Sequence, residues 1–207
     1  MPDGTQISRG SSAALLTLPN AITFARLCAV PASVYLVVER ELALAFYLFV
    51  AAGLSDAVDG WLARRGGGAS ALGAILDPVA DKALLVSMYV TLAAVGELPA
   101  WLAIMVVFRD VVIVGGVLML ALIGQPVAIH PLYVSKLNTT LQIVLVAATL
   151  FMAGFGLDHF QLAAAHFAPA AHFAPQAQYI KTVLIWAVGL TTLASGSAYV
   201  WNAVQTR

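Results

Sequence analysis

Residues 42–62, LALAFYLFVAAGLSDAVDGWL, contain a long run of apolar side chains that ends in two aspartates. A helix that crosses a lipid bilayer needs about 20 mostly apolar residues. Apolar side chains occur all round this segment and not in a single stripe, as expected where lipid replaces water around a helix. The stretch therefore predicts a transmembrane helix with acidic groups at one end.

Five further segments have the same character. Together with residues 42–62 they predict six transmembrane helices, and their expected ranges are 18–38, 76–96, 99–123, 137–157 and 179–203. Short polar or turn-forming stretches separate them, among them Glu39–Glu41 and Gly66–Gly68. The expected fold is an all-α integral membrane protein, with a short juxtamembrane segment over residues 1–17 and a six-helix membrane domain over residues 18–207.

The composition supports this class and excludes others. Hydrophobic residues make up 61% of the 207 and charged residues only 10%, whereas a soluble domain is about a quarter charged. Ten basic and ten acidic residues balance, so no polycationic face is available for nucleic acid. A single cysteine, Cys28, excludes an intrachain disulfide and a thiolate metal cluster.

The placement of lysine and arginine predicts the orientation. Only Arg40 and Lys181 are expected on one side of the bilayer, whereas the other side receives Arg9, Arg64, Arg65, Lys82, Lys136 and Arg207. The positive-inside rule makes the basic-rich side cytoplasmic, with both termini inside. Residues 1–17 lack the apolar core of a signal peptide and the repeated arginines of a transit peptide, so a bacterial inner membrane is the expected location.

Four aspartates are concentrated around the second and third predicted helices. Asp56 and Asp59 stand three residues apart at the inner end of one, and Asp77 and Asp81 stand four apart at the inner start of the next. Both spacings place paired carboxylates on one helix face. The short connection predicts antiparallel neighbours, so the four acids are expected to face one another at the cytoplasmic boundary.

Four carboxylates in a small space repel one another and need compensating positive charge. Arg64, Arg65 and Lys82 can supply part of it, and hard oxygen ligands favour two bound Mg²⁺ or Mn²⁺ ions, an arrangement typical of phosphoryl transfer. Carboxylates merely solvated at helix ends are the competing interpretation. That interpretation leaves unexplained the small residues spaced among the acids, Gly60, Ala63 and Gly73.

Written out, these residues form the pattern Asp56-x2-Asp59-Gly60-x2-Ala63-Arg64-x8-Gly73-x3-Asp77-x3-Asp81. The pattern resembles the signature of the CDP-alcohol phosphatidyltransferases, in which a hydroxyl attacks the β-phosphorus of a CDP-linked lipid or alcohol and CMP leaves. The resemblance implies that the four aspartates bind two divalent cations and that Asp81 also takes the proton of the acceptor.

The same resemblance implies a binding site for CDP-diacylglycerol and a homodimer. The segment Pro19-Asn20-x2-Thr23-x2-Arg26 is similar to the part of the family that completes the nucleotide site. Gly115 and Gly116 in the fourth predicted helix offer a close-packed surface for dimerisation. The residues implied to contact CDP-diacylglycerol are Asn20, Thr23, Gly60, Ala63, Arg64, Ser70 and Gly73.

The acceptor is predicted from the fourth and fifth helices. Arg109 lies in the fourth, where an intramembrane arginine is expected to bind an acceptor phosphate; a mutual ion pair with the adjacent Asp110 is the alternative. Lys136, Thr139 and Gln142 recur every three residues and are expected to share a polar face that also contacts the acceptor.

These stretches resemble the cardiolipin synthases that join phosphatidylglycerol to CDP-diacylglycerol and release CMP, which is the predicted function. The alternative is a phosphatidylglycerophosphate synthase, whose acceptor is glycerol 3-phosphate. That acceptor carries close to two negative charges and favours more nearby cations than this chain offers.

Two further interpretations are weaker. A cation transporter would also need intramembrane acids, but transporters bind substrate near the midplane, whereas these acids are expected at one interface. His159, His166 and His172 lie in a stretch where Ala-His-Phe-Ala-Pro occurs twice. An outward-facing interfacial loop is favoured there over a metal site.

Overall fold

The structure, a computed structural model, describes residues 18–65, 71–122, 133–156 and 174–205. Within these ranges the chain forms α-helices and no strand. The helices are α1 (Leu18–Val38), α2 (Leu42–Arg65), α3 (Ala71–Ala94), α4 (Ala100–Leu122), α5 (Tyr133–Gly154) and α7 (Ala174–Gln205). The predicted all-α fold is confirmed for the described residues.

The helix boundaries differ from the prediction mainly at the starts of α3, α5 and α7, each of which begins four or five residues earlier than expected. α1 has the predicted range, but α2 continues to Arg65, and α3 begins at Ala71 and not near Leu76. The sequence 71–76 is mostly alanine, leucine and isoleucine, which permit helix despite one glycine and the proline that follows. Gly73 and Asp77 therefore lie inside α3.

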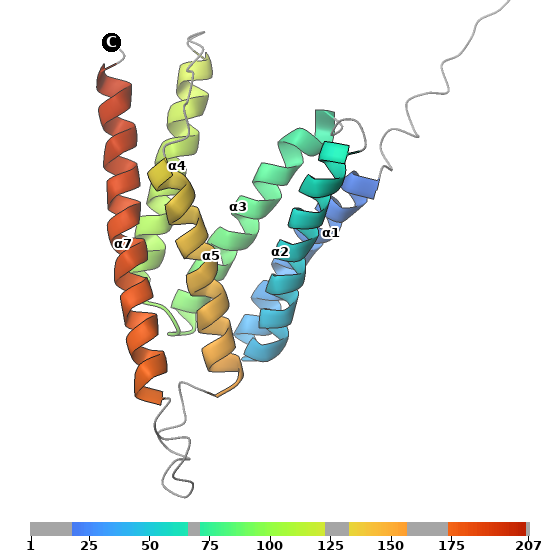
Figure 1. The fold of residues 1–207 in the computed structure, drawn as a ribbon, viewed down its shortest axis with the longest axis vertical. Helices are drawn as coiled ribbons and strands as arrows, with labels where there is room; N and C mark the ends of the chain where they lie inside the picture. Colours follow the sequence, from blue (N-terminus) through green and yellow to red (C-terminus); the bar gives the residue numbers. More distant parts are fainter. Residues whose placement is uncertain (1–17, 66–70, 123–132, 157–173, 206–207) are drawn as a thin grey trace, which may run out of the picture.

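Successive helices run in alternating directions (Figure 1). The end of α2 lies beside the start of α3, and we call this the signature end of the bundle. The opposite end holds the turn from α1 to α2 and the turn from α3 to α4. α3 packs against α1 and α4, whereas α5 packs against α2 and α7. This arrangement places α4 next to the helix that carries Asp81, with α5 touching the same helix less extensively, and α7 packs against α4 and α5.

The core lies where α3, α4 and α5 meet. Its largest fully buried side chains include Met88, Tyr89, Leu92, Leu102, Leu145 and Leu150. The outward faces are also apolar: Ile104 and Phe108 are 68% and 69% exposed, and Leu190 is 65% exposed. Extended exposed apolar surface is unfavourable in water and suits a lipid environment.

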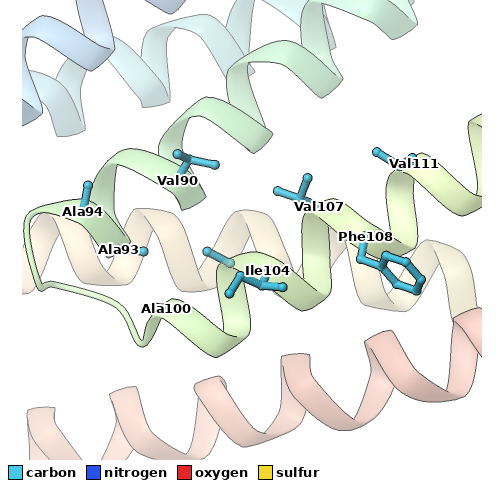
Figure 2. A pocket seen from close by; sticks show the side chains of 9 residues that line it. Val90, Ala93, Ala94, Ala100, Ile104, Val107, Phe108 and Val111 are labelled. Atoms are coloured by element: carbon cyan, nitrogen blue, oxygen red, sulfur yellow. The ribbon is translucent and has the colours of Figure 1, made fainter.

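An apolar groove between α3 and α4 extends this surface (Figure 2). Only apolar side chains line it, among them Val90, Ala94, Ile104, Val107, Phe108 and Val111. Two described segments, Tyr133–Gly154 and Gln178–Ala198, are long and apolar enough to cross a membrane, whereas Phe24–Val38 and Leu42–Ser55 are apolar but shorter. These features are consistent with a membrane protein, and the six-span layout with its division at residue 17 stays a prediction.

The opposite end is held by an ion-pair cluster. Arg40, which has a φ of 64°, donates to the carboxylate of Glu97 at 3.1 Å and to the carbonyl of Val95 at 2.6 Å. The ammonium of Lys181 lies 3.6 Å from the second oxygen of Glu97. The two basic residues predicted on the basic-poor side thus meet at one carboxylate, which joins both turns to α7.

The close packing of α5 on α2 depends on Gly154. A Cβ there would lie 2.6 Å from the backbone nitrogen of Ala43 and 2.8 Å from its Cα. Backbone cannot swing aside as a side chain does, so we expect Gly154→Ala to lower the free energy of unfolding by about 1–3 kcal/mol. Thermal or denaturant unfolding in detergent measures this. Gly53→Ala, whose Cβ meets nothing within 4 Å, should be neutral or slightly stabilising; equal losses would contradict the close approach.

Candidate functional site

The signature is carried by two helices that meet at the signature end. α2 bears Asp56 and Asp59 and α3 bears Asp77 and Asp81. Figure 1 shows the end of α2 and the start of α3 at the same end of the bundle, with the two helices running in opposite directions. Among the described contacts α2 packs against α1 and α5, and α3 packs mainly against α1 and α4, so the predicted neighbour pairing of α2 with α3 stays a prediction. The side chains of Asp56, Asp59 and Asp77 fall outside what the structure describes. Consequently, the described side chains contain no group of three or more potential metal ligands, and the predicted two-metal site stays a prediction.

The predicted nucleotide-binding residues are placed only by their backbone. Asn20 and Thr23 lie in the first turns of α1, and Gly60, Ala63, Arg64 and Gly73 lie in the signature parts of α2 and α3; their side chains are outside the described set. Ser70 and the three histidines at 159, 166 and 172 lie outside the described residues altogether.

Asp81 is held by a cation from another helix. Its Oδ1 accepts a hydrogen bond from Nη1 of Arg26 in α1 at 2.8 Å. The side chain of Arg26 is only 1% exposed, whereas that of Asp81 is 46% exposed. A buried arginine therefore positions one oxygen of the proposed base while the carboxylate still faces open space.

A second ion-pair network lies one residue further along α3. The ammonium of Lys82 lies 2.7 Å from Oδ2 of Asp110, and Nη1 of Arg109 donates to Oδ1 of the same carboxylate at 2.7 Å. Asp110 and Arg109 are 6% and 5% exposed. Asp110 thus bridges two cations, one from α3 and one from α4, beside the helix that carries Asp81.

Arg109 also connects α4 to α5 and α7. Its Nη2 donates to Oγ of Ser135 at 2.5 Å and to Oγ of Ser195 at 2.7 Å. Its Nε is buried and has no hydrogen-bond partner among the described residues. Among the described side chains, the guanidinium consequently has one anionic partner, Asp110, and that partner is shared with Lys82.

Lys136, Thr139 and Gln142, which were predicted to share one polar face of α5, differ in how deeply they are buried. Gln142 is fully buried, Thr139 is half-buried and bonds back to the carbonyl of Ser135, and Lys136 is exposed. The residue on the same inward face as Gln142 is Asn138, whose Oδ1 accepts hydrogen bonds from Thr191 and Thr192 of α7. The face that points into the bundle is therefore Ser135, Asn138 and Gln142.

Two ionic assignments differ from the sequence analysis. Lys82, expected to compensate the aspartate cluster, pairs with Asp110. Arg26, expected only as part of the nucleotide segment, is the cation on Asp81. The signal for the second was present, because an arginine inside an apolar helix needs an acid at the same depth.

The α7 hydroxyls were missed. Thr191, Thr192 and Ser195 share roughly one helix face in an otherwise apolar segment, a pattern that indicates hydrogen bonding between membrane helices.

Comparison with known proteins agrees with the signature. The sequence profile described as CDP-alcohol phosphatidyltransferase matches residues 16–194. The chain belongs to the CDP-alcohol phosphatidyltransferase family.

Relatives with two different activities are similar to it. A human cardiolipin synthase (CMP-forming) is 34% identical over 65% of this chain and 50% of its own length. A cardiolipin synthase and mitochondrial hydrolase fusion protein of Schizosaccharomyces pombe is 32% identical over 89% of this chain and 31% of its own length. A CDP-diacylglycerol–glycerol-3-phosphate 3-phosphatidyltransferase of Bacillus subtilis is 29% identical over 93% of this chain and 99% of its own length. The chain thus spans half or less of the two synthases named first.

The Asp110 bridge yields a stability prediction. Asp110→Asn leaves buried Arg109 without its anion, so we expect the free energy of unfolding to fall by about 3–5 kcal/mol. Arg40→Gln at the opposite end removes an arginine whose side chain is 57% exposed, and it should cost no more than about 1 kcal/mol. Unfolding in detergent measures both, and a loss for Asp110→Asn no larger than for Arg40→Gln would contradict the buried bridge.

Proposed function

We propose that this protein is a cardiolipin synthase of a bacterial inner membrane, with its active site at the cytoplasmic face. It transfers a phosphatidyl group from CDP-diacylglycerol to phosphatidylglycerol and releases CMP. Family membership supports the donor half of this reaction. The observation that carries the acceptor half is buried Arg109, which lies beside the signature helix and, among the described side chains, shares one carboxylate partner, Asp110, with Lys82.

The charge of that network favours a monoanionic acceptor. Lys82 and Arg109 bring two positive charges against one negative charge on Asp110, which leaves a net charge of plus one. A phosphodiester such as phosphatidylglycerol carries one negative charge, whereas the phosphomonoester of glycerol 3-phosphate carries close to two. Both activities occur among the relatives, so phosphatidylglycerophosphate synthesis is the alternative.

The predicted acceptor residues have separate parts in this proposal. Arg109 binds the phosphodiester through its guanidinium, and Thr139 and Gln142 line the neighbouring face of α5. Lys136 is exposed next to Ser135, where it can attract the anionic headgroup before it reaches Arg109. Gly115 and Gly116 in α4 are exposed, and a Cβ on either would meet nothing within 4 Å, so this surface is open to a second copy in the proposed homodimer.

The chemistry follows from the residues at the signature end. Asp56, Asp59, Asp77 and Asp81 have the hard oxygen donors that Mg²⁺ or Mn²⁺ prefers, and two such ions would neutralise the pyrophosphate as charge develops. Asp81, held by Arg26, takes the proton from the acceptor hydroxyl. That oxygen bonds to the β-phosphorus, and the bond to CMP breaks. Arg64 pairs with the pyrophosphate.

The remaining donor contacts are assigned by resemblance to the family. They hold the CDP moiety of CDP-diacylglycerol in place during the transfer, and the residues proposed for them are Asn20, Thr23, Gly60, Ala63, Ser70 and Gly73.

The role of Asp81 is tested by Asp81→Asn. The amide cannot accept the hydroxyl proton and is a weaker metal ligand, so we expect CMP release to fall by at least about 10²-fold. Labelled CDP-diacylglycerol in mixed micelles measures the rate, and thermal unfolding checks that the variant is folded. Glu41→Gln, at the opposite end of the bundle, should keep the wild-type rate. Wild-type turnover by Asp81→Asn would exclude Asp81 as the base.

The acceptor and the cations are tested together. Purified enzyme receives labelled CDP-diacylglycerol and, in separate reactions, phosphatidylglycerol, glycerol 3-phosphate, serine or inositol phosphate, each with Mg²⁺, Mn²⁺ or EDTA. We expect cardiolipin from phosphatidylglycerol alone, no product in EDTA and recovery on adding either ion, because four carboxylates need cations to bind a pyrophosphate. Phosphatidylglycerophosphate as product would establish the alternative. Failure with every acceptor would reopen the transporter interpretation.

A further inference from the structure

The inward face of α5 carries amide groups whose hydrogen-bonding capacity is not filled. Asn138 and Gln142 are both 0% exposed. Nδ2 of Asn138 and both polar side-chain atoms of Gln142 are buried and have no hydrogen-bond partner in the part of the chain that the structure describes. An unpaired buried polar group costs about 1–3 kcal/mol. Two adjacent amides left in this state point to a ligand that completes them.

The orientation of Asn138 says which chemistry the ligand has. Its Oδ1 accepts from Thr191 at 2.8 Å and from Thr192 at 3.0 Å. With the oxygen engaged on both sides, the opposite NH₂ group is left to donate. Gln142 follows one turn later on the same face and adds a second NH₂. A ligand that satisfies both NH₂ groups must present oxygen acceptors in an otherwise apolar environment; of the two amides, it leaves only Oε1 of Gln142 without a donor among the described residues.

The position of these amides relative to Arg109 says which part of a ligand reaches them. Ser135, which accepts from Arg109, shares its face with Asn138 and Gln142 at the spacing i, i+3, i+7. At a rise of 1.5 Å per residue, the amides lie about 4.5 and about 10.5 Å further along the helix than Ser135. They are therefore further from the signature end than the cation proposed for the phosphodiester.

A phospholipid has acceptor-only oxygens at this place. In any diacyl phospholipid the glycerol backbone separates the phosphate from two fatty-acyl ester carbonyls, which lie deeper in the leaflet than the phosphate. We propose that Asn138 and Gln142 bind the ester carbonyls of the acceptor phospholipid while Arg109 binds its phosphodiester. The inference rests on the proposed function and specifies that the acceptor is recognised as a diacylglycerol lipid and not only by its headgroup.

CDP-diacylglycerol has the same carbonyls, but the signature that would hold its pyrophosphate is on α2 and α3, whereas these amides are on α5 beside Arg109. The two amides are buried in this structure, so the diacylglycerol part of the acceptor reaches them by separating α5 from α7. The described polar contacts across this seam are the bonds of Asn138 to Thr191 and Thr192. In addition, the guanidinium of Arg109 in α4 bridges Ser135 of α5 and Ser195 of α7.

The test compares diacyl phosphatidylglycerol with its dialkyl-ether analogue, which differs by lacking the two carbonyl oxygens. With ordinary CDP-diacylglycerol as donor, we expect the wild-type KM for the ether lipid to be about three- to tenfold higher, the effect of one or two hydrogen bonds. The quantity compared between variants is the ether-to-ester ratio, which is the KM for the ether lipid divided by the KM for the diacyl lipid. In Gln142→Met we expect the KM for the diacyl lipid to rise and that for the ether lipid to stay unchanged, so this ratio falls toward one.

A stability measurement separates binding from a structural role. Methionine is apolar and close in shape, so removing an unpaired amide should leave the melting temperature of Gln142→Met equal to or above that of the wild type. A lower melting temperature with an unchanged lipid ratio would show a structural role and overturn the proposal. Thr149→Val is the matched control, because Thr149 Oγ1 is also buried without a partner in the described chain and lies two turns further along α5. It should keep the wild-type ratio.

The remaining outcomes distinguish this inference from the proposed function. Cardiolipin formation with an unchanged ether-to-ester ratio in Gln142→Met overturns the inference alone. The same comparison can be made with ether-linked CDP-diacylglycerol as donor. If Gln142→Met changes the ether-to-ester ratio for the donor and not for the acceptor, the amides bind the donor, and the inference is overturned. If neither phosphatidylglycerol yields cardiolipin, the proposed function fails and the inference fails with it.

Discussion

The arrangement of this site depends on a buried carboxylate, Asp110, that two cations share. An ionised group away from water is stable only where opposite charges and hydrogen bonds replace its hydration. Lys82 and Arg109 provide that replacement from α3 and α4, and Arg109 extends the contacts to Ser135 of α5 and Ser195 of α7. Four helices are consequently fixed around one charged group. Asp81 directly precedes Lys82 on α3, so this network also helps to fix the position of the proposed base.

The two charged networks have complementary tasks. Arg26 lies on the side of Asp81 that faces α1, whereas Lys82 directs its ammonium toward α4. Because a helix turns by about 100° per residue, adjacent positions naturally face different neighbours. In the proposed function, Arg26 holds the base Asp81 from one side. The cations near Asp110 attract the anionic acceptor from the other side. In the proposed function, the charge balance around Asp110 is the feature that selects an acceptor with a single negative charge.

The sequence predicted the part of the fold that follows from continuous apolar character. Leu18–Val38 was predicted with its observed bounds, because charged residues follow it directly. The start of α3 was predicted too late, near Leu76, although the residues before it are mostly helix-forming.

The ion pair between the adjacent Arg109 and Asp110 was one of the two interpretations from the sequence, and the structure contains it. The pairings between different helices could not be predicted in the same way. Which acid an arginine meets depends on how far neighbouring helices slide along and rotate about one another, and sequence spacing within one helix contains no such information. Arg26 and Asp81 are far apart in the chain, as are Arg109 and Ser195. Likewise, a three-residue repeat suggested Lys136 as the partner of Gln142, whereas the actual face follows 3.6 residues per turn and selects Asn138.

The cluster at Glu97 has a mechanical consequence. It ties the α1–α2 turn, the α3–α4 turn and the beginning of α7 to one carboxylate, all at the end of the bundle that is remote from the aspartates. Helices that are joined at one end of a bundle pivot about that end when they move, and such a pivot displaces their opposite ends most. Small changes of helix angle near Glu97 would therefore produce the largest displacements at the signature end, where the proposed lipid substrates would enter.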